Sequence, residues 1–164
     1  MKHGESLLYP FGFLLGTDAP DQLAHFERAS FPVPLWVNGN TSYATATKGE
    51  CTCFLTGEIV LPAQPQLTIS DLAQLLAQSG SKYQDIVDQF IGRFAVAIIL
   101  PSGLFVQNDA SGMRSLYFNV SGDTPIVGTH ASLVAGINEQ SVSAVARFRK
   151  FGCPGISTPF ANTF

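Results

Sequence analysis

Residues 93–100 read RFAVAIIL, a run in which only the first residue is polar. An apolar run of this length predicts a β-strand buried on both faces, because a half-exposed strand would alternate apolar and polar residues. Pro101-Ser102-Gly103 predicts a turn, after which residues 104–107 return as the hairpin partner. A strand covered on both faces needs a second sheet on one side and helices on the other. We therefore predict an α+β fold in which two mainly antiparallel sheets pack together, with helices outside.

The flanking segments predict the other parts of this architecture. Residues 70–79 and 81–91 carry apolar side chains at helical spacing, and Ser81 with Gln84 predicts a capping box for the second helix. Residues 51–61 read CTCFLTGEIVL and predict a strand that either runs through or breaks at its central glycine. The remaining predicted elements are strands within 7–16 and at 33–37, 115–120 and 125–128, and helices at 20–28 and 138–151.

The composition limits the classes of function. The chain has 164 residues, about one ordinary domain, with a net charge of -3 and a pI of about 5.5. It has no basic patch that could neutralise the phosphates of a nucleic acid. Nothing at the N-terminus of the sequence resembles a signal peptide, and no apolar run approaches the roughly 20 residues of a membrane span. Three cysteines, an odd number, fit a reducing compartment. We expect a cytoplasmic protein that binds neither nucleic acid nor membrane.

Several segments occur in an order that is found in one enzyme family. Residues 54–59 (FLTGEI) resemble the family's Asn-Gly-Glu-Ile segment, and residues 68–71 (TISD) resemble its Thr-Gly-Ser-Asp turn. Residues 90–98 (FIGRFAVAI) resemble its Leu-x-Gly-x-Phe-Ala strand, and residues 108–117 (NDASGMRSLY) resemble Arg-Asp-x-x-Gly-x-x-Pro-Leu-Tyr. Residues 128–133 (GTHASL) stand where the family has a Ser-Glu pair before a short helix. Together they resemble the N-terminal glutaminase domain of the asparagine synthetase family, a class II glutamine amidotransferase. The resemblance implies an N-terminal-nucleophile (Ntn) hydrolase fold, a four-layer α/β/β/α sandwich. It also implies that residues 1–152 are the glutaminase-like domain and 153–164 a linker toward a synthetase domain that is missing here.

The chemistry of that family depends on an N-terminal cysteine. Its thiolate attacks the amide of glutamine, and its free α-amino group serves as the base. This sequence begins Met1-Lys2 instead. Thr56 replaces an asparagine whose side-chain amide would stabilise the oxyanion, and no residue clearly matches the arginine that holds the carboxylate of glutamine. We therefore predict that the chain contains no catalytic residue.

A vestigial glutamine pocket is predicted at Thr56, Gly57, Glu58 and Asp71. In the family, the acids that match Glu58 and Asp71 bind the amino group of glutamine, and the region of Gly57 makes backbone contacts. The alternative is that both acids are kept for folding. Asp71 stands at the start of a predicted helix, where it would form a capping box with Thr68.

The internal cysteines are predicted to be structural. We expect Cys51 and Cys53 to face opposite sides of their strand and to have no chemical role. Cys-x-Cys lacks the spacing of a zinc site and the three histidines are scattered, so no metal site is predicted. Asp109 and Gly112 are also interpreted as structural, the glycine in a turn.

The leading hypothesis is a non-catalytic glutaminase-like domain that acts as a scaffold for an ATP-dependent amide-forming synthetase domain, in cis or in trans. Similar degenerate domains are kept in β-lactam synthetases and lasso-peptide cyclases, which use an internal amine as the nucleophile. The chain lacks a Ser-Gly-Gly-x-Asp loop, so no cofactor is expected in it, and ATP and Mg would belong to the synthetase domain. Two alternatives stay open: a binding module for a precursor peptide or small ligand, and a glutamine-hydrolysing amidotransferase with an altered N-terminus.

Overall fold

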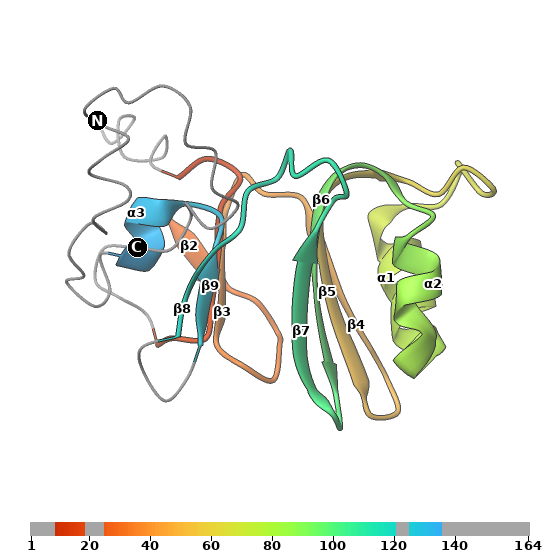
Figure 1. Cartoon of the computed structure of the whole chain (residues 1–164), viewed down its shortest axis with the longest axis horizontal. Helices are drawn as coiled ribbons and strands as arrows, with labels where there is room; N and C mark the ends of the chain where they lie inside the picture. Colours follow the sequence, from red (N-terminus) through yellow and green to blue (C-terminus); the bar gives the residue numbers. More distant parts are fainter. Residues whose placement is uncertain (1–8, 19–24, 121–124, 136–164) are drawn as a thin grey trace, which may run out of the picture.

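The structure, a computed structural model, describes residues 9–18, 25–120 and 125–135, and these form an α+β fold with two antiparallel sheets (Figure 1). One sheet has four strands in the order β4 (Tyr43–Lys48), β5 (Cys51–Val60), β6 (Ile91–Leu100) and β7 (Gly103–Asn108). The other has five, in the order β2 (Phe26–Arg28), β3 (Leu35–Asn38), β1 (Phe13–Leu15), β9 (Ile126–Gly128) and β8 (Tyr117–Asn119). The predicted class and the two antiparallel sheets are confirmed.

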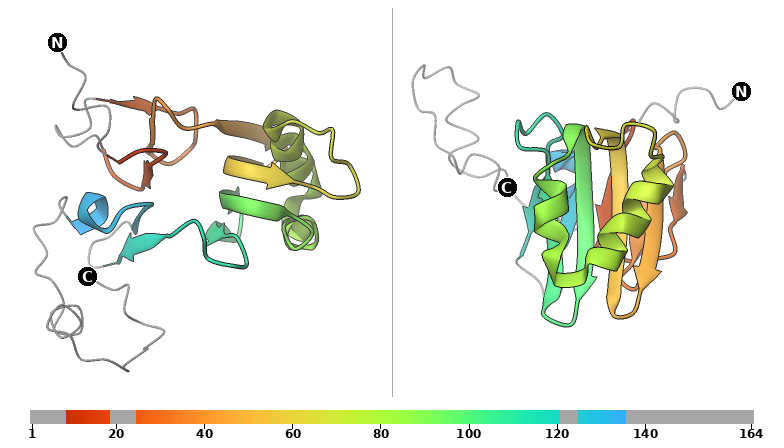
Figure 2. Two further views of the ribbon diagram at one scale, coloured as in Figure 1. Left: turned by 90° about the horizontal axis from the view of Figure 1, so that it is seen from above. Right: turned by 90° about the vertical axis from the view of Figure 1, so that its right-hand side faces the viewer.

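The described helices lie outside the two sheets. Helices α1 (Ile69–Ser79) and α2 (Tyr83–Val87) cross the outer face of the four-stranded sheet, as the right-hand view of Figure 2 shows. The short helix α3 (Ala131–Ala135) lies on the side of the five-stranded sheet that faces away from the four-stranded one (Figure 1). There Leu133 and Val134 pack with Leu14 and Ile126.

Strand β6 is buried on both faces, as its apolar run predicts. Phe94, Val96 and Ile98 pack into the core beneath α1 and α2. Ala95 and Ala97 point the other way, into the core between the two sheets. The alternation that would normally place polar residues on one face is absent because water reaches neither face of the middle of this strand.

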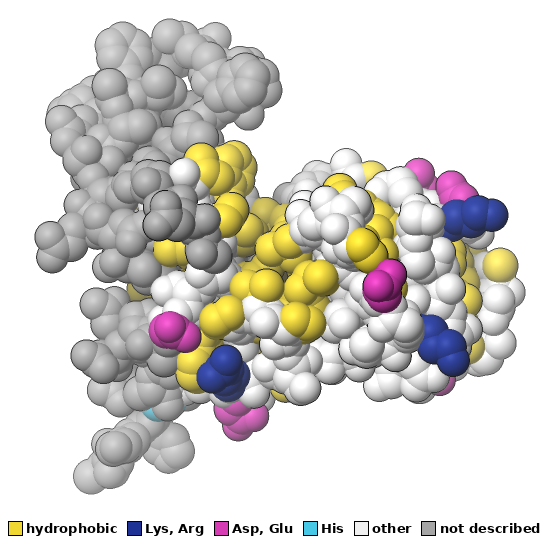
Figure 3. Space-filling model, turned by 90° about the horizontal axis from the view of Figure 1, so that it is seen from below, with side chains coloured by type: hydrophobic (Ala, Val, Ile, Leu, Met, Phe, Trp, Pro, Cys, Tyr) yellow, Lys and Arg dark blue, Asp and Glu magenta, His cyan; other side chains and the backbone are white. Residues whose placement is uncertain are grey.

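The core between the sheets is built around one aromatic side chain. Phe54 is fully buried, and its ring centroid lies 5.3 Å from that of Phe13 in the opposite sheet. The rings of Phe31 and Tyr43 lie 6.4 and 5.8 Å away. The alanines of β6 leave room for this cluster. At the lower side of the molecule, hydrophobic side chains gather along the seam between the two sheets (Figure 3).

The first predicted helix is confirmed as α1, but the second is much shorter than the apolar pattern predicts. A 3-10 turn (η2, Gly80–Lys82) precedes α2, and no side chain caps α2, so the predicted Ser81 cap is wrong. The pattern misleads because its last two apolar residues, Phe90 and Ile91, lie outside the helix. Phe90 packs on Phe94, with ring centroids 5.6 Å apart, and Ile91 begins β6.

The segment before β5 also differs from the prediction. Residues 26–28 form β2 and pair with β3, whereas a helix was predicted over 20–28, of which 20–24 lie outside the described residues. Strand β4 was not predicted at all. It pairs with β5 along its whole length, and Gly49 supplies the positive φ of the turn between them. The missed strand completes the four-stranded sheet.

The later predicted elements are partly described. The predicted hairpin is confirmed with shorter strands, because β8 pairs antiparallel with β9. The strands predicted within 7–16 and at 33–37 correspond to β1 and β3. The helix predicted at 138–151 and the linker at 153–164 lie outside the described residues. The domain boundary at 152 therefore stays a prediction.

Strand β5 runs through Gly57 without a break. Gly57 has φ of +120° and faces Phe94 of β6 in the register. A Cβ at this position would lie 2.1 Å from the carbonyl oxygen of Arg93. Only glycine fits here without a shift of the strands, and the close approach brings the upper ends of β5 and β6 together at the site described next.

Candidate binding cleft

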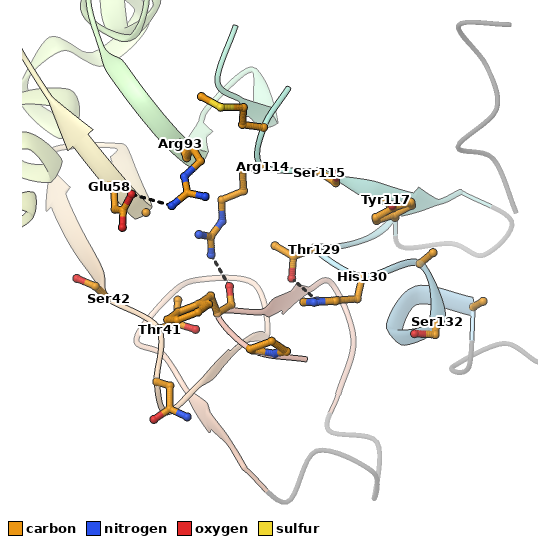
Figure 4. Close-up of a pocket in the computed structure, with 17 residues that line it drawn as sticks. Thr41, Ser42, Glu58, Arg93, Arg114, Ser115, Tyr117, Thr129, His130 and Ser132 are labelled. Atoms are coloured by element: carbon orange, nitrogen blue, oxygen red, sulfur yellow. Dashed lines mark hydrogen bonds and ion pairs between the residues drawn. The ribbon is translucent and has the colours of Figure 1, made fainter. Parts of the chain in front are cut away.

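A cleft of about 1250 Å³ lies where the upper ends of the two sheets meet. Strands β5 and β6 contribute Gly57, Glu58 and Arg93, and the loop after β7 contributes Met113 to Ser115. The opposite wall comes from the residues before β1, the β3–β4 connection and the residues that lead into α3. In Figure 4, Arg93 and Arg114 point into the same space, with Glu58 on one side and Thr129 and His130 on the other.

The loop that carries Arg114 is organised by Asp109. The Asp109 carboxylate accepts hydrogen bonds from the backbone amides of Met113 (3.0 Å) and Arg114 (2.9 Å) and from the hydroxyl of Ser111. Burial acts to raise the pKa of Asp109, but these hydrogen bonds outweigh it and hold the pKa below its usual value. Asp109 thus has a structural role, as the sequence predicts.

Two further features hold the same loop. Gly112 has φ of +66° and its amide donates to the carbonyl of Asp109, so it is the predicted turn glycine. Asn108 donates from Nδ2 to the carbonyl of Arg114 at 2.8 Å. Because hydrogen bonds hold both the amide and the carbonyl of Arg114, its side chain is directed toward the cleft rather than toward solvent.

The Arg114 guanidinium has few partners for its five N–H groups. Nη2 donates to the carbonyl of Phe11 and, at 3.5 Å, to the hydroxyl of Thr56. Nε is buried and has no hydrogen-bond partner. Among the residues that the structure describes, no carboxylate lies within ion-pair distance of this group. Burial, together with the charge of Arg93, lowers the pKa of Arg114 despite the nearby acids Asp109 and Glu58.

The second arginine is already neutralised. Arg93 and Glu58 face each other across β5 and β6, and the guanidinium nitrogen lies 2.9 Å from the carboxylate oxygen. Both side chains are largely exposed, at 58% for Arg93 and 82% for Glu58. Such an exposed pair stabilises a fold by no more than about 1 kcal/mol, so its importance lies in cancelling the charge of Arg93 at the mouth of the cleft.

The opposite wall carries a hydroxyl and an imidazole in contact. The Thr129 hydroxyl accepts from the backbone amide of Phe13 (3.1 Å) and shares a hydrogen bond with Nδ1 of His130 (2.9 Å). Burial, and then the charge of Arg114, lowers the pKa of His130. His130 is therefore neutral at pH 7, and the cleft keeps one net positive charge from two arginines and one glutamate.

The structure separates the four residues of the predicted glutamine pocket. Gly57 and Glu58 line the cleft. Thr56 is fully buried just behind it, where its hydroxyl donates to the carbonyl of Ser42 at 2.8 Å. Asp71 is not among the described residues that line the cleft.

Asp71 instead begins helix α1. Its carboxylate accepts from the amide of Thr68 at 2.9 Å, and its own amide donates to the Thr68 hydroxyl at 3.2 Å. These are the two bonds of a capping box, so the predicted folding role of Asp71 is confirmed. The hydrogen bonds from the side chain and then the backbone of Thr68 lower the pKa of Asp71.

The expectation that Cys51 and Cys53 face opposite sides of β5 is wrong. Both lie in the core under α1, because residues two apart on a strand point to the same face. Burial raises the pKa of both thiols, and for Cys53 the neighbouring Cys51 adds to the effect. Neither cysteine lines the cleft.

Sequence analysis missed the residues that dominate the cleft. Arg114 lies within a segment compared with the family, but only its acid and its glycine were weighed. Arg93 was treated as the start of an apolar strand, and His130 as one of three scattered histidines. An arginine two residues after a turn glycine, in a chain with nine basic residues, is the signal that could have directed attention to Arg114.

Comparison with known proteins does not assign a family. No protein-family model matches the chain, and a search of curated proteins finds no match. Within residues 9–18, 25–120 and 125–135, no helix is long and apolar enough to cross a membrane. The same residues contain no group of three or more His, Cys, Asp and Glu side chains that could hold a metal ion.

Proposed function

We propose that this chain is a non-catalytic glutaminase-like domain that acts as a scaffold for the synthetase domain of a cytoplasmic, ATP-dependent amide-forming enzyme of the asparagine synthetase superfamily. The proposed fold is the four-layer α/β/β/α sandwich of Ntn hydrolases. Two facing antiparallel sheets support it, with α1 and α2 outside one sheet and α3 outside the other.

One observation carries the proposal: two of the four residues predicted for the glutamine pocket line a cleft to which no cysteine contributes among the residues that the structure describes. Gly57 and Glu58 line it, but none of the described residues that line it is a cysteine. The hydroxyl of Thr56 already donates to a backbone carbonyl and accepts from Arg114. Thr56 is therefore not free to donate a hydrogen bond to an oxyanion, which catalysis of amide hydrolysis would need.

The internal cysteines Cys51 and Cys53 do not supply the missing nucleophile. A cysteine nucleophile acts as its thiolate. Burial holds the pKa of Cys51 and Cys53 above the usual range, so both are protonated at neutral pH. They also lie on the face of β5 that packs under α1 rather than in the cleft.

The test measures ammonia released from glutamine by this chain and by the longest protein that contains it. We expect no release above that of a Glu58→Gln variant. Release that disappears in Glu58→Gln would contradict the proposal and favour the third hypothesis, a working amidotransferase. The scaffold role is tested separately: deletion of residues 1–152 from an ATP-dependent amide-forming parent should abolish its soluble expression or activity.

The binding-module hypothesis has its own support. A cleft of about 1250 Å³ with an arginine that lacks an acidic partner is more than a scaffold requires. Binding and scaffolding do not exclude each other, and the ligand is considered next.

A further inference from the structure

The cleft carries positive charge on a protein that is negative overall. The chain has a net charge of -3, yet among the described residues the charged ones that line the cleft are Arg93, Arg114 and Glu58. Glu58 forms an ion pair with Arg93 at 2.9 Å, so the charges of these two residues cancel. The charge left over is that of Arg114, and it stands at the meeting point of two sheets rather than on an open surface.

Within the part of the chain that the structure describes, Arg114 is held there by neutral acceptors only. Its guanidinium donates to a backbone carbonyl and a hydroxyl, and Nε is buried without a partner. Asp109, whose charge acts on Arg114, uses both carboxylate oxygens on the amides and hydroxyl of its own loop. A buried N–H without an acceptor is costly, and a buried charge is normally paired. An anion in the cleft would supply the charge that the guanidinium lacks.

We propose that the cleft binds a small organic monocarboxylate and that Arg114 is the residue that binds its carboxylate group. A guanidinium binds a carboxylate through two parallel hydrogen bonds. A monoanion matches the single uncompensated charge, whereas a phosphate dianion would leave a surplus negative charge close to Glu58. The proposal uses only the residues that line the cleft, so it does not depend on the glutaminase-like assignment.

The rest of the lining indicates what the carboxylate is attached to. Phe11 and Met113 line the cleft and are each 60% exposed, so both offer apolar surface to a ligand. Phe11 also has φ of +56°, a rare conformation for an aromatic residue, directly before the glycine that leads into β1. Hydroxyl groups of Thr41, Ser42 and Ser115 complete the wall. We infer a ligand with an apolar group beside the carboxylate.

The first experiment compares charged and neutral forms of one ligand. The chain is titrated with N-acetyl-L-phenylalanine, with its neutral amide, with acetate and with inorganic phosphate, by calorimetry at low salt. We expect N-acetyl-L-phenylalanine to bind most tightly and its amide at least about tenfold more weakly, the loss of one charge-assisted contact. Equal affinity for acid and amide, tighter binding of phosphate, or no saturable binding of either carboxylate would overturn the proposal.

The second experiment uses the two arginines as matched variants. Arg114→Gln should weaken binding of N-acetyl-L-phenylalanine by roughly 10- to 100-fold. Arg93→Gln, which removes an arginine from the same cleft that already has a partner, should change it less than about threefold. Equal losses in the two variants would show that general positive charge is responsible and would overturn the role of Arg114.

A measurement on the unchanged chain covers the case in which Arg114→Gln does not fold. In a ¹H–¹⁵N NMR titration with acetate, the Nε–H signal of Arg114 should shift as the carboxylate binds. A titration in which only the Nε–H signal of Arg93 shifts would overturn the proposal. Far-UV circular dichroism establishes whether each variant is folded.

Discussion

Alanine at Gly57 should destabilise the protein far more than alanine at Gly103. Both glycines have a φ that other residues avoid, +120° and +136°, so both variants carry a backbone strain of about 1–3 kcal/mol. They differ in what the new Cβ meets. At Gly103 nothing lies within 4 Å, whereas at Gly57 the carbonyl oxygen of Arg93 would lie at 2.1 Å.

The clash sets the size of the difference. To reach 3.0 Å, β5 and β6 must separate locally by roughly 0.9 Å. That separation weakens neighbouring hydrogen bonds of the ladder, at about 0.5–1.5 kcal/mol each. We therefore expect Gly57→Ala to lower the free energy of unfolding by roughly 3–5 kcal/mol and Gly103→Ala by about 1–2 kcal/mol.

Urea unfolding followed by circular dichroism measures both losses, provided that the variants keep the same dependence on urea concentration. Gly57→Ala should also weaken any ligand binding in the cleft, since Gly57 lines it and the backbone of β6 beside it must shift. Losses that agree within about 1 kcal/mol would refute the reasoning, because they would mean that the two strands absorb the added atom without cost.

Three other perturbations probe the core, the loop of the cleft and the thiols. Phe54→Ala, at a fully buried ring between the sheets, should cost about 3–5 kcal/mol in urea unfolding, and Phe105→Ala, at a ring that is 40% exposed, less than about 1 kcal/mol; comparable losses would mean that the sheets are not packed as described. The pKa of Asp109 lies below its unfolded value, so its contribution to stability is present above about pH 4 and is lost as the pH falls through the folded pKa. Asp109→Asn should therefore flatten the decline of stability toward acid pH, measured by thermal unfolding, and an unchanged acid limb would count against the loop geometry. With the third cysteine replaced by serine, Cys51 and Cys53 should react with a thiol reagent at least roughly tenfold faster in denaturant than in buffer, because burial keeps them protonated when folded.

The sequence predicts an element of the fold well when the residues of that element allow only a few structural environments. The run at 93–100 could be interpreted correctly because a strand apolar on both faces has few possible environments. The helix at 81–91 could not, because apolar residues at helical spacing do not show where the chain leaves the helix. Phe90 and Ile91 fit the helical pattern equally well, yet they lead into β6.

The missed strand β4 illustrates a different limit. Its sequence, YATATK, alternates threonine with alanine and has little hydrophobicity, so only its pairing with β5, from one end of β4 to the other, makes it a strand. Partner-dependent strands of this kind are the hardest to recognise locally. The capping box at α1 lies at the opposite extreme, since Thr68 and Asp71 satisfy each other and need no distant partner.

The part of the candidate site that lies within one strand could be predicted from the sequence, whereas the part that depends on contacts between distant segments could not. Gly57 and Glu58 follow each other in one strand, so their placement together needed no tertiary information. The contact of Arg114 with Phe11 joins residues that are 103 positions apart. No local pattern contains such a contact, and the chemistry of the cleft depends on it.

The character of the cleft therefore traces back to a carboxylate that does not line it. Asp109 holds the amides of Met113 and Arg114, and that loop directs the guanidinium toward Thr56 and the carbonyl of Phe11. Burial, and then the charge of the same guanidinium, lowers the pKa of His130, so the neutral imidazole does not compete with Arg114 for an anion. A loop fixed by one buried acid thus places in the cleft a cation that has no acidic partner among the described residues. Loss of that acid should alter both stability and ligand binding, whereas loss of Arg114 should alter chiefly binding.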